Sequence, residues 1–469
     1  MTHNDAKSTS PANNQMPDGT LLPTWRDANV HDDLTVVAVG DLILSDAIAP
    51  LLSERSPQVL TLLRSGDVTF GNFESTAIDL EHFGGWPEAD SGGGWLISTP
   101  AVPADLRYMG FNMVSRANNH TTDWGVAGMR STDRLLSEAG IVHAGTGETL
   151  SHARAPRYMT LPPGRISLVA TASRFESMSR AADPMGRVPG RPGASTLRAT
   201  RHVMVPAHRL KDLAAIRDAQ PAGSVRASIT EADRVNETVT LFGTTYAASD
   251  EADDGVTFRF LVNEQDRQEF LGAVRQAKQT SDFSVATMHT HEPGNYSEEP
   301  PDFLITTARQ CIDAGADAFI GHGPHQLRGI ELYQGRPIFY SLGNFFYTKN
   351  TMHPLTPDEG LRDAKADRTT LTPAEYQEHV RVHGVFRERV WFESVITVSR
   401  FNRHGHLRTI ELHPVELHWD GPRDADRGIP RLAAADVAEN ILSRLQRLSK
   451  PFNTEITVKD GVGYVDCDG

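Results

Sequence analysis

Two pairs of histidines stand at the ends of two apolar runs, and these residues are well suited to binding a metal. The run ADAFIGHGPHQ (316–326) carries His322 and His325, and FSVATM (283–288) leads into His289 and His291. Imidazole is the commonest metal ligand in proteins. Two strands that each deliver imidazoles at their carboxyl ends therefore predict a metal site, provided that acidic and amide ligands reach the same place.

Three earlier clusters supply such ligands. They are GD (40–41), GNFES (71–75) and ANNHTTDWG (117–125), whose polar members include Asp41, Asn72, Glu74, Asn118, Asn119, His120 and Asp123. Carboxylate, amide and imidazole together suit Mn, Zn, Fe or Co and match calcium poorly. Such a set can hold two ions about 3.5–4 Å apart, with a bound hydroxide as nucleophile. His120 would then lie near a leaving group as a general acid.

Each cluster alone has a simpler structural interpretation. Gly-Asp after a strand is typical of a turn, Asn-His before a helix is typical of a cap, and a lone buried histidine is usually a hydrogen-bonded core residue. The five clusters come in chain order, and each follows an apolar run. Because functional groups collect at the carboxyl ends of parallel strands, this joint placement favours a metal site.

The pattern around these clusters predicts an α/β protein. Expected strands cover 34–40, 67–72, 111–117, 141–145, 165–171, 283–288, 317–322 and 337–344, with 394–401 and 409–417 nearer the C-terminus. Expected helices cover 124–138, with Asp123 as N-cap, 300–315 and 433–448. Residues 1–32 read as a flexible tail, and residues 33–469 as a single domain. Two stretches, about 173–256 and 347–390, are too long for ordinary loops and are expected to be insertions.

Composition excludes several classes of protein. The formal net charge is −14 over 469 residues, which argues against general nucleic-acid binding because counterion release needs a basic face. A local metal and a few arginines can still attract an anionic substrate. No apolar run is long enough to span a bilayer, and no secretory signal or other membrane anchor is visible. The two cysteines do not make a disulfide framework, so we expect a cytoplasmic protein.

The order of the motifs resembles the CapA family, the capsule or poly-γ-glutamate synthesis proteins. The resemblance rests on Gly-Asp, Gly-Asn-x-Glu, Asn-Asn-His-x-x-Asp-x-Gly, His, Gly-His-x-x-His and SLGNF, and covers roughly Leu34 to Phe346. GTGETLSHARAP (145–156) and GRPGASTLR (190–198) also look like segments of that family. The family is similar to calcineurin-like metallophosphoesterases, which implies a layered α/β sandwich with mixed sheets.

The resemblance also implies roles for individual residues. The implied metal ligands are Asp41, Glu74, Asn119, His289, His322 and His325. His120 would be the general acid, with Asp123 and His291 as further catalytic candidates. His291 could equally be a ligand, a partner that orients a ligand, or a substrate contact. Metallophosphoesterases usually begin with Asp-x-His, whereas Leu42 and Ile43 follow Asp41 here. One or two divalent ions (Mn, Zn or Fe) are therefore expected.

Five arginines near these motifs are candidates for holding an anionic substrate: Arg116, Arg174, Arg187, Arg191 and Arg328. Guanidinium groups pair bidentately with carboxylate or phosphate, although each could instead form a surface ion pair. Trp86 and Trp95 flank the glycines of SGGG (91–94), which could form a flap or a plain surface loop.

These observations lead to a hypothesis of a soluble metal-dependent hydrolase. Its substrate would be an anionic small molecule or oligomer, cleaved at an amide or γ-glutamyl-type bond. A phosphoesterase is one alternative. Another is a non-catalytic accessory protein that binds a polyanion in poly-γ-glutamate metabolism. Homo-oligomers are possible. The chain has neither GxSxG nor GxxxxGK[ST], which argues against a serine hydrolase or a nucleotide-driven synthetase.

Overall fold

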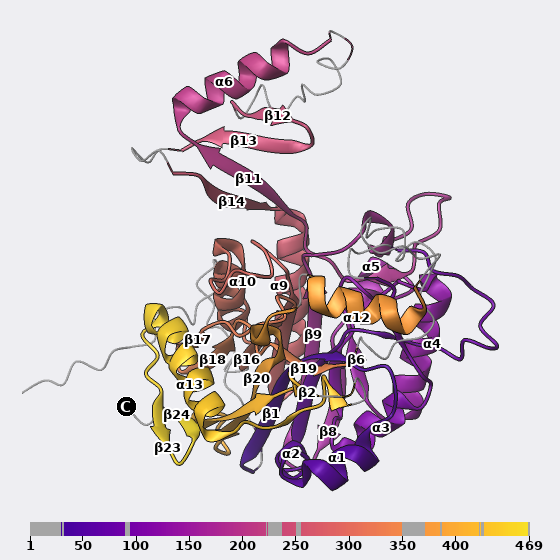
Figure 1. Ribbon diagram of the computed structural model, residues 1–469, viewed down its shortest axis with the longest axis vertical. Helices are drawn as coiled ribbons and strands as arrows, with labels where there is room; N and C mark the ends of the chain where they lie inside the picture. Colours follow the sequence, from indigo (N-terminus) through magenta and orange to yellow (C-terminus); the bar gives the residue numbers. More distant parts are fainter. Residues whose placement is uncertain are drawn as a thin grey trace, which may run out of the picture.

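The computed structural model describes residues 30, 32–89, 94–221, 223, 237–249, 255–348, 371–384, 387–421, 423 and 426–467. Two mixed β-sheets lie face to face, with helices on their outer faces (Figure 1). This arrangement confirms the layered α/β sandwich with mixed sheets that the sequence predicts. Among the described helices, none combines the length and the apolar composition needed to cross a membrane.

The first sheet has ten strands, and its central strand is β1 (Leu34–Ile43). Along the sheet the strands run β23 (Thr457–Lys459), β24 (Val462–Asp466), β21 (Leu407–Glu416), β20 (Glu393–Phe401), β1, β2 (Val68–Phe73), β5 (Met113–Ser115) and β6 (Val142–Ala144). Two short strands join them, β19 (Asn344–Tyr347) beside β1 and β22 (Arg431–Leu432) beside β21. β1 is parallel to β2 and antiparallel to β20, so the sheet is mixed.

The second sheet has six strands and carries the histidine motifs. Its order is β17 (Ile330–Tyr333), β18 (Arg336–Phe339), β16 (Ala318–His322), β15 (Phe283–His289), β9 (Gly164–Ala172) and β8 (Arg157–Leu161). The four middle strands are parallel, and an antiparallel strand closes each edge. All the carboxyl ends of the parallel strands therefore lie at one end of this sheet.

Alternation along the strands builds the layers. In β1, Val36 and Ala38 pack into the core between the sheets, while Val37 and Val39 pack toward the helices on the outer face. That outer face is covered by α1 (Ala49–Arg55), α2 (Pro57–Leu63), α3 (Val102–Met109) and α4 (Gly125–Glu138). The second sheet is covered by α9 (Glu264–Gln279) and α10 (Asp302–Asp313). Because successive side chains of a strand point to opposite faces, each sheet can bury both of its faces.

The remaining elements close the edges. α13 (Ala435–Ser449) packs into the core between the sheets, where the sequence predicted a helix over 433–448. The short elements are β3 (Thr76–Ala77), β4 (Ile97–Ser98), β7 (Thr146–Gly147), α5 (Leu150–Arg154), β10 (Gly193–Ala194), α12 (Pro373–His383) and the 3₁₀ turns at Ser177–Ser179, Arg389–Phe392 and Lys450–Phe452.

One predicted strand is divided in two. The sequence predicted a single strand over 337–344, but β18 ends at Phe339 in the second sheet and β19 begins at Asn344 in the first. The chain crosses between sheets through Ser341-Leu342-Gly343, where Gly343 has φ +74°. Glycine adopts this left-handed conformation without steric cost. The crossing places Asn344 opposite Asp41 in the first sheet.

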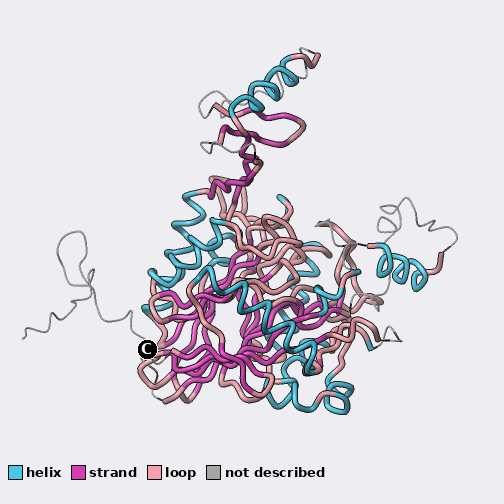
Figure 2. The backbone as a smooth tube through the Cα atoms, turned by 60° about the vertical axis from the view of Figure 1, so that its left-hand side comes forward, coloured by secondary structure: helices cyan, strands magenta, loops and turns pink. Residues whose placement is uncertain are grey.

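The first predicted insertion forms an arm that projects from the body (Figures 1 and 2). Its four-stranded sheet runs in the order β12 (Val239–Leu241), β13 (Thr244–Ala248), β11 (Ala199–Val205) and β14 (Thr257–Val262), and carries α6 (Ala207–Asp218). The arm thus begins later and ends later than the predicted 173–256, because residues 173–198 stay on the body and pair β10 with β7. Of the second insertion, residues 349–370 lie outside the described residues, as do the tail residues 1–29.

Candidate metal centre

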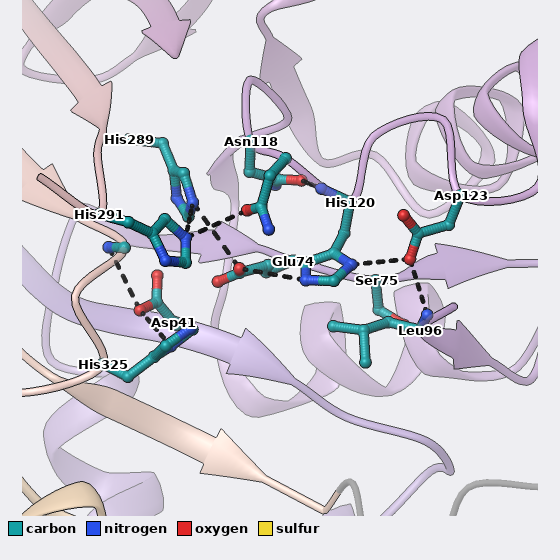
Figure 3. A network of polar contacts seen from close by, with 12 residues as sticks. Asp41, Glu74, Ser75, Leu96, Asn118, His120, Asp123, His289, His291 and His325 are labelled. Carbon is teal, nitrogen blue, oxygen red and sulfur yellow. Dashed lines mark hydrogen bonds and ion pairs between the residues drawn. The ribbon is translucent and has the colours of Figure 1, made fainter. Parts of the chain in front are cut away.

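The polar turns meet where the carboxyl ends of strands from both sheets come together (Figure 3). Asp41 lies near the end of β1 and is the register partner of Asn72 in β2. Glu74 follows β2 directly. His289 and His322 are the last residues of β15 and β16, and they are partners in that parallel ladder. All of these side chains are buried. The fold thus gathers at one point residues that lie far apart in the sequence.

Three sets of candidate ligands lie close enough to hold an ion. In each set the ligand atoms are within 4.8 Å of one another: Asp41 with His289 and His322, Glu74 with His289 and His291, and Asp41 with Glu74 and His325. Asn119 adjoins the second set, because its Oδ1 lies 3.3 Å from His291 Nε2. The structure therefore brings together all six predicted ligands and places His291 among them. Since the sets share members, two neighbouring ions could be held.

The cluster holds a carboxylate oxygen without a donor and ring nitrogens within hydrogen-bond distance of one another. Glu74 Oε1 is buried without a hydrogen-bond donor. His289 Nδ1 lies 2.9 Å from His322 Nδ1, and His289 Nε2 lies 2.9 Å from His291 Nε2. A neutral imidazole has one N–H and one lone pair, so each close contact can be a single N–H···N hydrogen bond, and the accepting lone pair could bind an ion instead. An ion bound by these lone pairs and by the orphaned oxygen would satisfy them, so the residues fit a divalent transition metal.

Burial sets the charges of the site. Desolvation and the neighbouring imidazoles hold the pKa of His289 well below its usual value, and burial lowers the pKa of His322 to about 4. Burial together with the charge of Asp41 raises the pKa of Glu74 well above its usual value. Burial also opposes ionisation of Asp41, but the hydrogen bond and charge of His325 hold its pKa below the ordinary range. Neutral imidazoles have free lone pairs, which is the form that binds a metal.

His120 and Asp123 form a buried pair beside these ligands. His120 Nδ1 lies 2.7 Å from Asp123 Oδ2, and His120 Nε2 lies 3.9 Å from Glu74 Oε1. Asp123 Oδ2 also accepts the Leu96 N–H at 2.7 Å. The prediction that Asp123 caps the following helix is wrong: Trp124 is the N-cap of α4 and makes no side-chain cap bond. The carboxylate is turned instead toward His120, where it favours a proton on Nδ1 and leaves Nε2 facing the site.

Comparison with known proteins identifies the family. The family model for the bacterial capsule synthesis protein PGA_cap matches residues 35–349. This chain belongs to that family. It is 46% identical over 444 residues to the protein y4uA of Sinorhizobium fredii, covering 93% of this chain and 94% of y4uA. It is 22% identical over 356 residues to the capsule biosynthesis protein CapA of Bacillus anthracis, covering 74% and 69%. The resemblance to CapA that the motifs indicated is thereby confirmed.

A solved structure of a phosphatase from Mycoplasma pneumoniae aligns with 82% of this chain and 94% of its own, at 8% identity and a TM-score of 0.36. This likeness is too distant to bear on activity. The chemistry of this member of the capsule synthesis family is therefore inferred from the residues of its own site.

Two asparagines hold the carboxylates of this family member in place. The Asn72 amide donates to Asp41 Oδ1 at 2.8 Å and to Glu74 Oε2 at 3.3 Å. Asn118 Nδ2 donates to Asn72 Oδ1 at 3.2 Å, and Asn118 Oδ1 accepts the backbone N–H of His120 at 3.1 Å. The sequence showed both amides beside candidate ligands but gave no reason to assign them this role. Their position next to the ligands was the available signal.

Two further residues orient imidazoles, and sequence reasoning missed both as site residues. Thr287 Oγ1 lies 2.9 Å from His322 Nε2, so Nδ1 of that ring is the nitrogen left for an ion. Asn344 Oδ1 lies 3.0 Å from His325 Nδ1. Thr287 precedes His289 by two residues in β15, and strand periodicity could have placed both on one face. Asn344 reaches the site because the chain crosses between sheets.

The structure corrects two of the five arginine assignments. Arg116 and Arg328 are fully buried, and their guanidinium groups bind backbone carbonyls. Arg116 donates to the carbonyls of Phe73 and Ser75. Arg328 donates to Glu292 and Ser297 in the loop after His291. Both side chains are enclosed by the protein and are not exposed for a substrate to reach.

The other three arginines are exposed. Burial lowers the pKa of His291 most, and the positive charge of Arg174 adds to this effect, so the guanidinium lies within electrostatic reach of that imidazole. Arg191 donates to the carbonyls of Arg180 and Ser177 within its own loop. Trp86 is exposed and Trp95 is buried, and residues 90–93 between them lie outside the described part of the chain.

Proposed function

We propose that this protein is a metal-dependent hydrolase that cleaves an amide or γ-glutamyl-type bond in an anionic substrate. The observation that carries the proposal is the His120–Asp123 pair. His120 Nε2 lies 3.9 Å from the carboxylate of Glu74, which is one of the candidate ligands. A binding site alone has no need of an oriented proton donor. Hydrolysis needs one, because the leaving group must be protonated as the bond breaks.

Different residues would bind the ions and transfer the proton. Asp41, Glu74, Asn119 and the imidazoles would hold one or two divalent ions, and such ions supply Lewis acidity toward water and toward the scissile group. Asp123 keeps the proton on His120 Nδ1. His120 Nε2 then passes its own proton to the leaving group, and the Asp123 carboxylate stabilises the imidazolium before that transfer. Burial of the whole cluster excludes bulk water and strengthens these interactions.

The substrate class rests on the family and on the rim of the site. CapA of Bacillus anthracis carries the name of a capsule biosynthesis protein, and a Bacillus subtilis relative is named a PGA biosynthesis protein. Arg174 adds positive charge beside His291 and can pair with a carboxylate. Arg187 and Arg191 are exposed in the adjoining loop. We therefore expect an anionic substrate that carries carboxylates.

A substrate panel tests the bond. The protein loaded with Mn²⁺ or Zn²⁺ is assayed on γ-glutamyl amides, short γ-linked glutamate oligomers and aryl phosphates. The proposal expects release of amine from the first two. Release of phosphate with no action on the amides would instead support a phosphoesterase. If no member is cleaved but glutamate oligomers bind, the protein is a polyanion-binding accessory protein and the hydrolase proposal fails.

Replacement of His120 tests the general acid. We expect His120→Asn to lower kcat by on the order of 10²-fold or more, because the leaving group loses its proton donor. Mn²⁺ binding, measured by titration calorimetry, should stay near the wild-type value. His82→Asn is a matched control, since His82 Nδ1 lies 2.8 Å from Asp79 in an exposed pair. A variant at His120 that turns over as fast as the His82 control would contradict this role.

A further inference from the structure

The buried side chain of Arg116 forms hydrogen bonds to the backbone on both sides of Glu74. Its Nη1 donates to the carbonyl of Phe73 at 2.9 Å and to the carbonyl of Ser75 at 2.8 Å. The guanidinium carbon also lies 5.5 Å from the centre of the Phe73 ring. The residue between the two bound carbonyls is a candidate ligand in two of the three sets. Arg116 therefore holds the backbone from which the Glu74 side chain projects, while Asn72 binds the Glu74 carboxylate itself.

Arg116 is itself fixed at both ends. The backbone N–H of Arg116 donates to the carbonyl of Ala144 at 2.8 Å, and the backbone carbonyl of Arg116 accepts from Thr121 Oγ1 at 2.6 Å. On the far side of the guanidinium, Nε lies 3.5 Å from Asp133 Oδ1. Because Arg116 is itself held in place, it can fix the position of the backbone carbonyls that it binds.

The same arginine connects two turns of the candidate metal centre. Arg116 stands at the start of the turn that carries Asn119 and His120, and it reaches across to the turn that carries Glu74. The Phe73 carbonyl accepts from Asn118 as well, at 3.0 Å. A planar guanidinium can donate to two carbonyls and pair with a carboxylate at once, which a lysine ammonium at the end of a flexible chain cannot reproduce.

We propose that Arg116 is a positioning residue for the metal centre, locking the Glu74 turn against the turn that carries Asn119 and His120. Its contribution to turnover rests on the proposed function, but its contribution to ion binding does not. Partners that orient metal ligands typically contribute about 10–100-fold in affinity or activity. The expected consequence of disturbing Arg116 is thus weaker ion binding without loss of the fold.

Titration of Mn²⁺ into Arg116→Lys tests the proposal, with Arg154→Lys as the matched control. Arg154 is also buried, and it donates to the Thr196 carbonyl and to Asp266 rather than to a turn of the site. We expect Arg116→Lys to bind Mn²⁺ at least about tenfold more weakly than wild type, and the control to bind it normally. The rise in melting temperature on adding Mn²⁺ should shrink for Arg116→Lys alone. Equal affinity in wild type and Arg116→Lys, or an equal loss in the control, overturns the proposal.

If Arg116→Lys does not fold, Asp133→Asn decides the question. This change leaves the guanidinium in place but removes its far-side partner at the edge of the core, so a severalfold loss of Mn²⁺ affinity is expected. Unchanged affinity in this variant then overturns the proposal. A wild-type protein that binds Mn²⁺ but cleaves nothing would refute the hydrolase function, and the affinity measurements would still test Arg116.

Discussion

Single charged residues in this protein are stabilised by several partners at once, and Asp266 is the clearest example outside the site. This buried carboxylate accepts from Arg198 at 2.7 Å, and from Arg154 and Arg180 at 3.1 Å each. Burial alone would raise its pKa, but the arginines outweigh burial and lower the pKa to about 2. Arg198 immediately precedes β11, so the cluster anchors the root of the arm.

Asp266→Asn should destabilise the protein strongly at neutral pH. Removing one member of a buried charge network costs about 3–5 kcal/mol, since the arginines lose their counter-charge. A carboxylate with a lowered folded-state pKa stabilises the fold above its unfolded pKa of about 3.9. That contribution disappears as the pH falls toward about 2. The free energy of unfolding, measured in urea, should therefore be lower for Asp266→Asn than for wild type at pH 7. The two values should converge in acid.

Glu138→Gln serves as the control for Asp266→Asn, because Glu138 pairs with Arg134 on the exposed surface. Its cost should stay within about 0.5 kcal/mol. A pH-independent loss in Asp266→Asn would show that the carboxylate acts through packing and not through its charge.

At the scale of residues, the sequence predicted which ligands meet but not which way other side chains point. Asp41, Glu74, His289 and His322 could be placed because they follow strands whose carboxyl ends share an edge. Arg116 also follows a strand, yet its guanidinium turns inward to two carbonyls. Direction depends on which unpaired backbone groups lie nearby in space, and that information is absent from local sequence. Asp123 was misassigned as a cap for the same reason, since its partner Leu96 is distant in sequence.

At the scale of elements, the centre depends on how closely β1 approaches the chain that enters β19. The Asp41 N–H donates to the carbonyl of Gly343 at 2.9 Å. A Cβ atom added at Gly40 would lie 1.8 Å from that carbonyl oxygen. Glycine at position 40 is therefore required by the close approach of two backbones. The predicted single strand over 337–344 hid this contact, because its apolar pattern continues across the crossing between the sheets.

Gly40→Ala should thus disturb the centre through the backbone. We expect a loss of about 1–3 kcal/mol in stability, as in other overpacked cores, and weaker Mn²⁺ binding because Asp41 must shift. Melting temperature and calorimetric titration of Mn²⁺ measure the two effects. Gly84→Ala is the control, since a Cβ at Gly84 would meet nothing within 4 Å. If Gly40→Ala matches that control in both measurements, the close approach is not required.

At the scale of the whole molecule, the candidate centre and the arm are built from separate parts. Every candidate ligand comes from the two large sheets and their connecting turns, whereas the arm has its own sheet. The arm touches the body near its root. Arg201 lies 4.0 Å from Glu292, the residue after His291, and Phe260 packs against Phe303 with ring centroids 5.2 Å apart. These root contacts lie beside the site, while no described residue of the arm belongs to the candidate ligand sets.

Excising the arm above its root tests this separation. Arg201 and Phe260 are partners in the antiparallel pair of β11 and β14, so replacing residues 202–259 with Asn-Gly leaves a two-residue hairpin of favoured geometry. The root contacts to Glu292 and Phe303 remain. We expect the shortened protein to fold and to bind Mn²⁺ with wild-type affinity, because all ligands and the packing of both large sheets are retained. Calorimetric titration and melting temperature measure this, with wild type as reference. Loss of Mn²⁺ binding in a folded, shortened protein would show that the arm takes part in shaping the centre. If binding is retained but hydrolysis of glutamate oligomers falls relative to γ-glutamyl amides, the arm contributes to recognition of longer substrates.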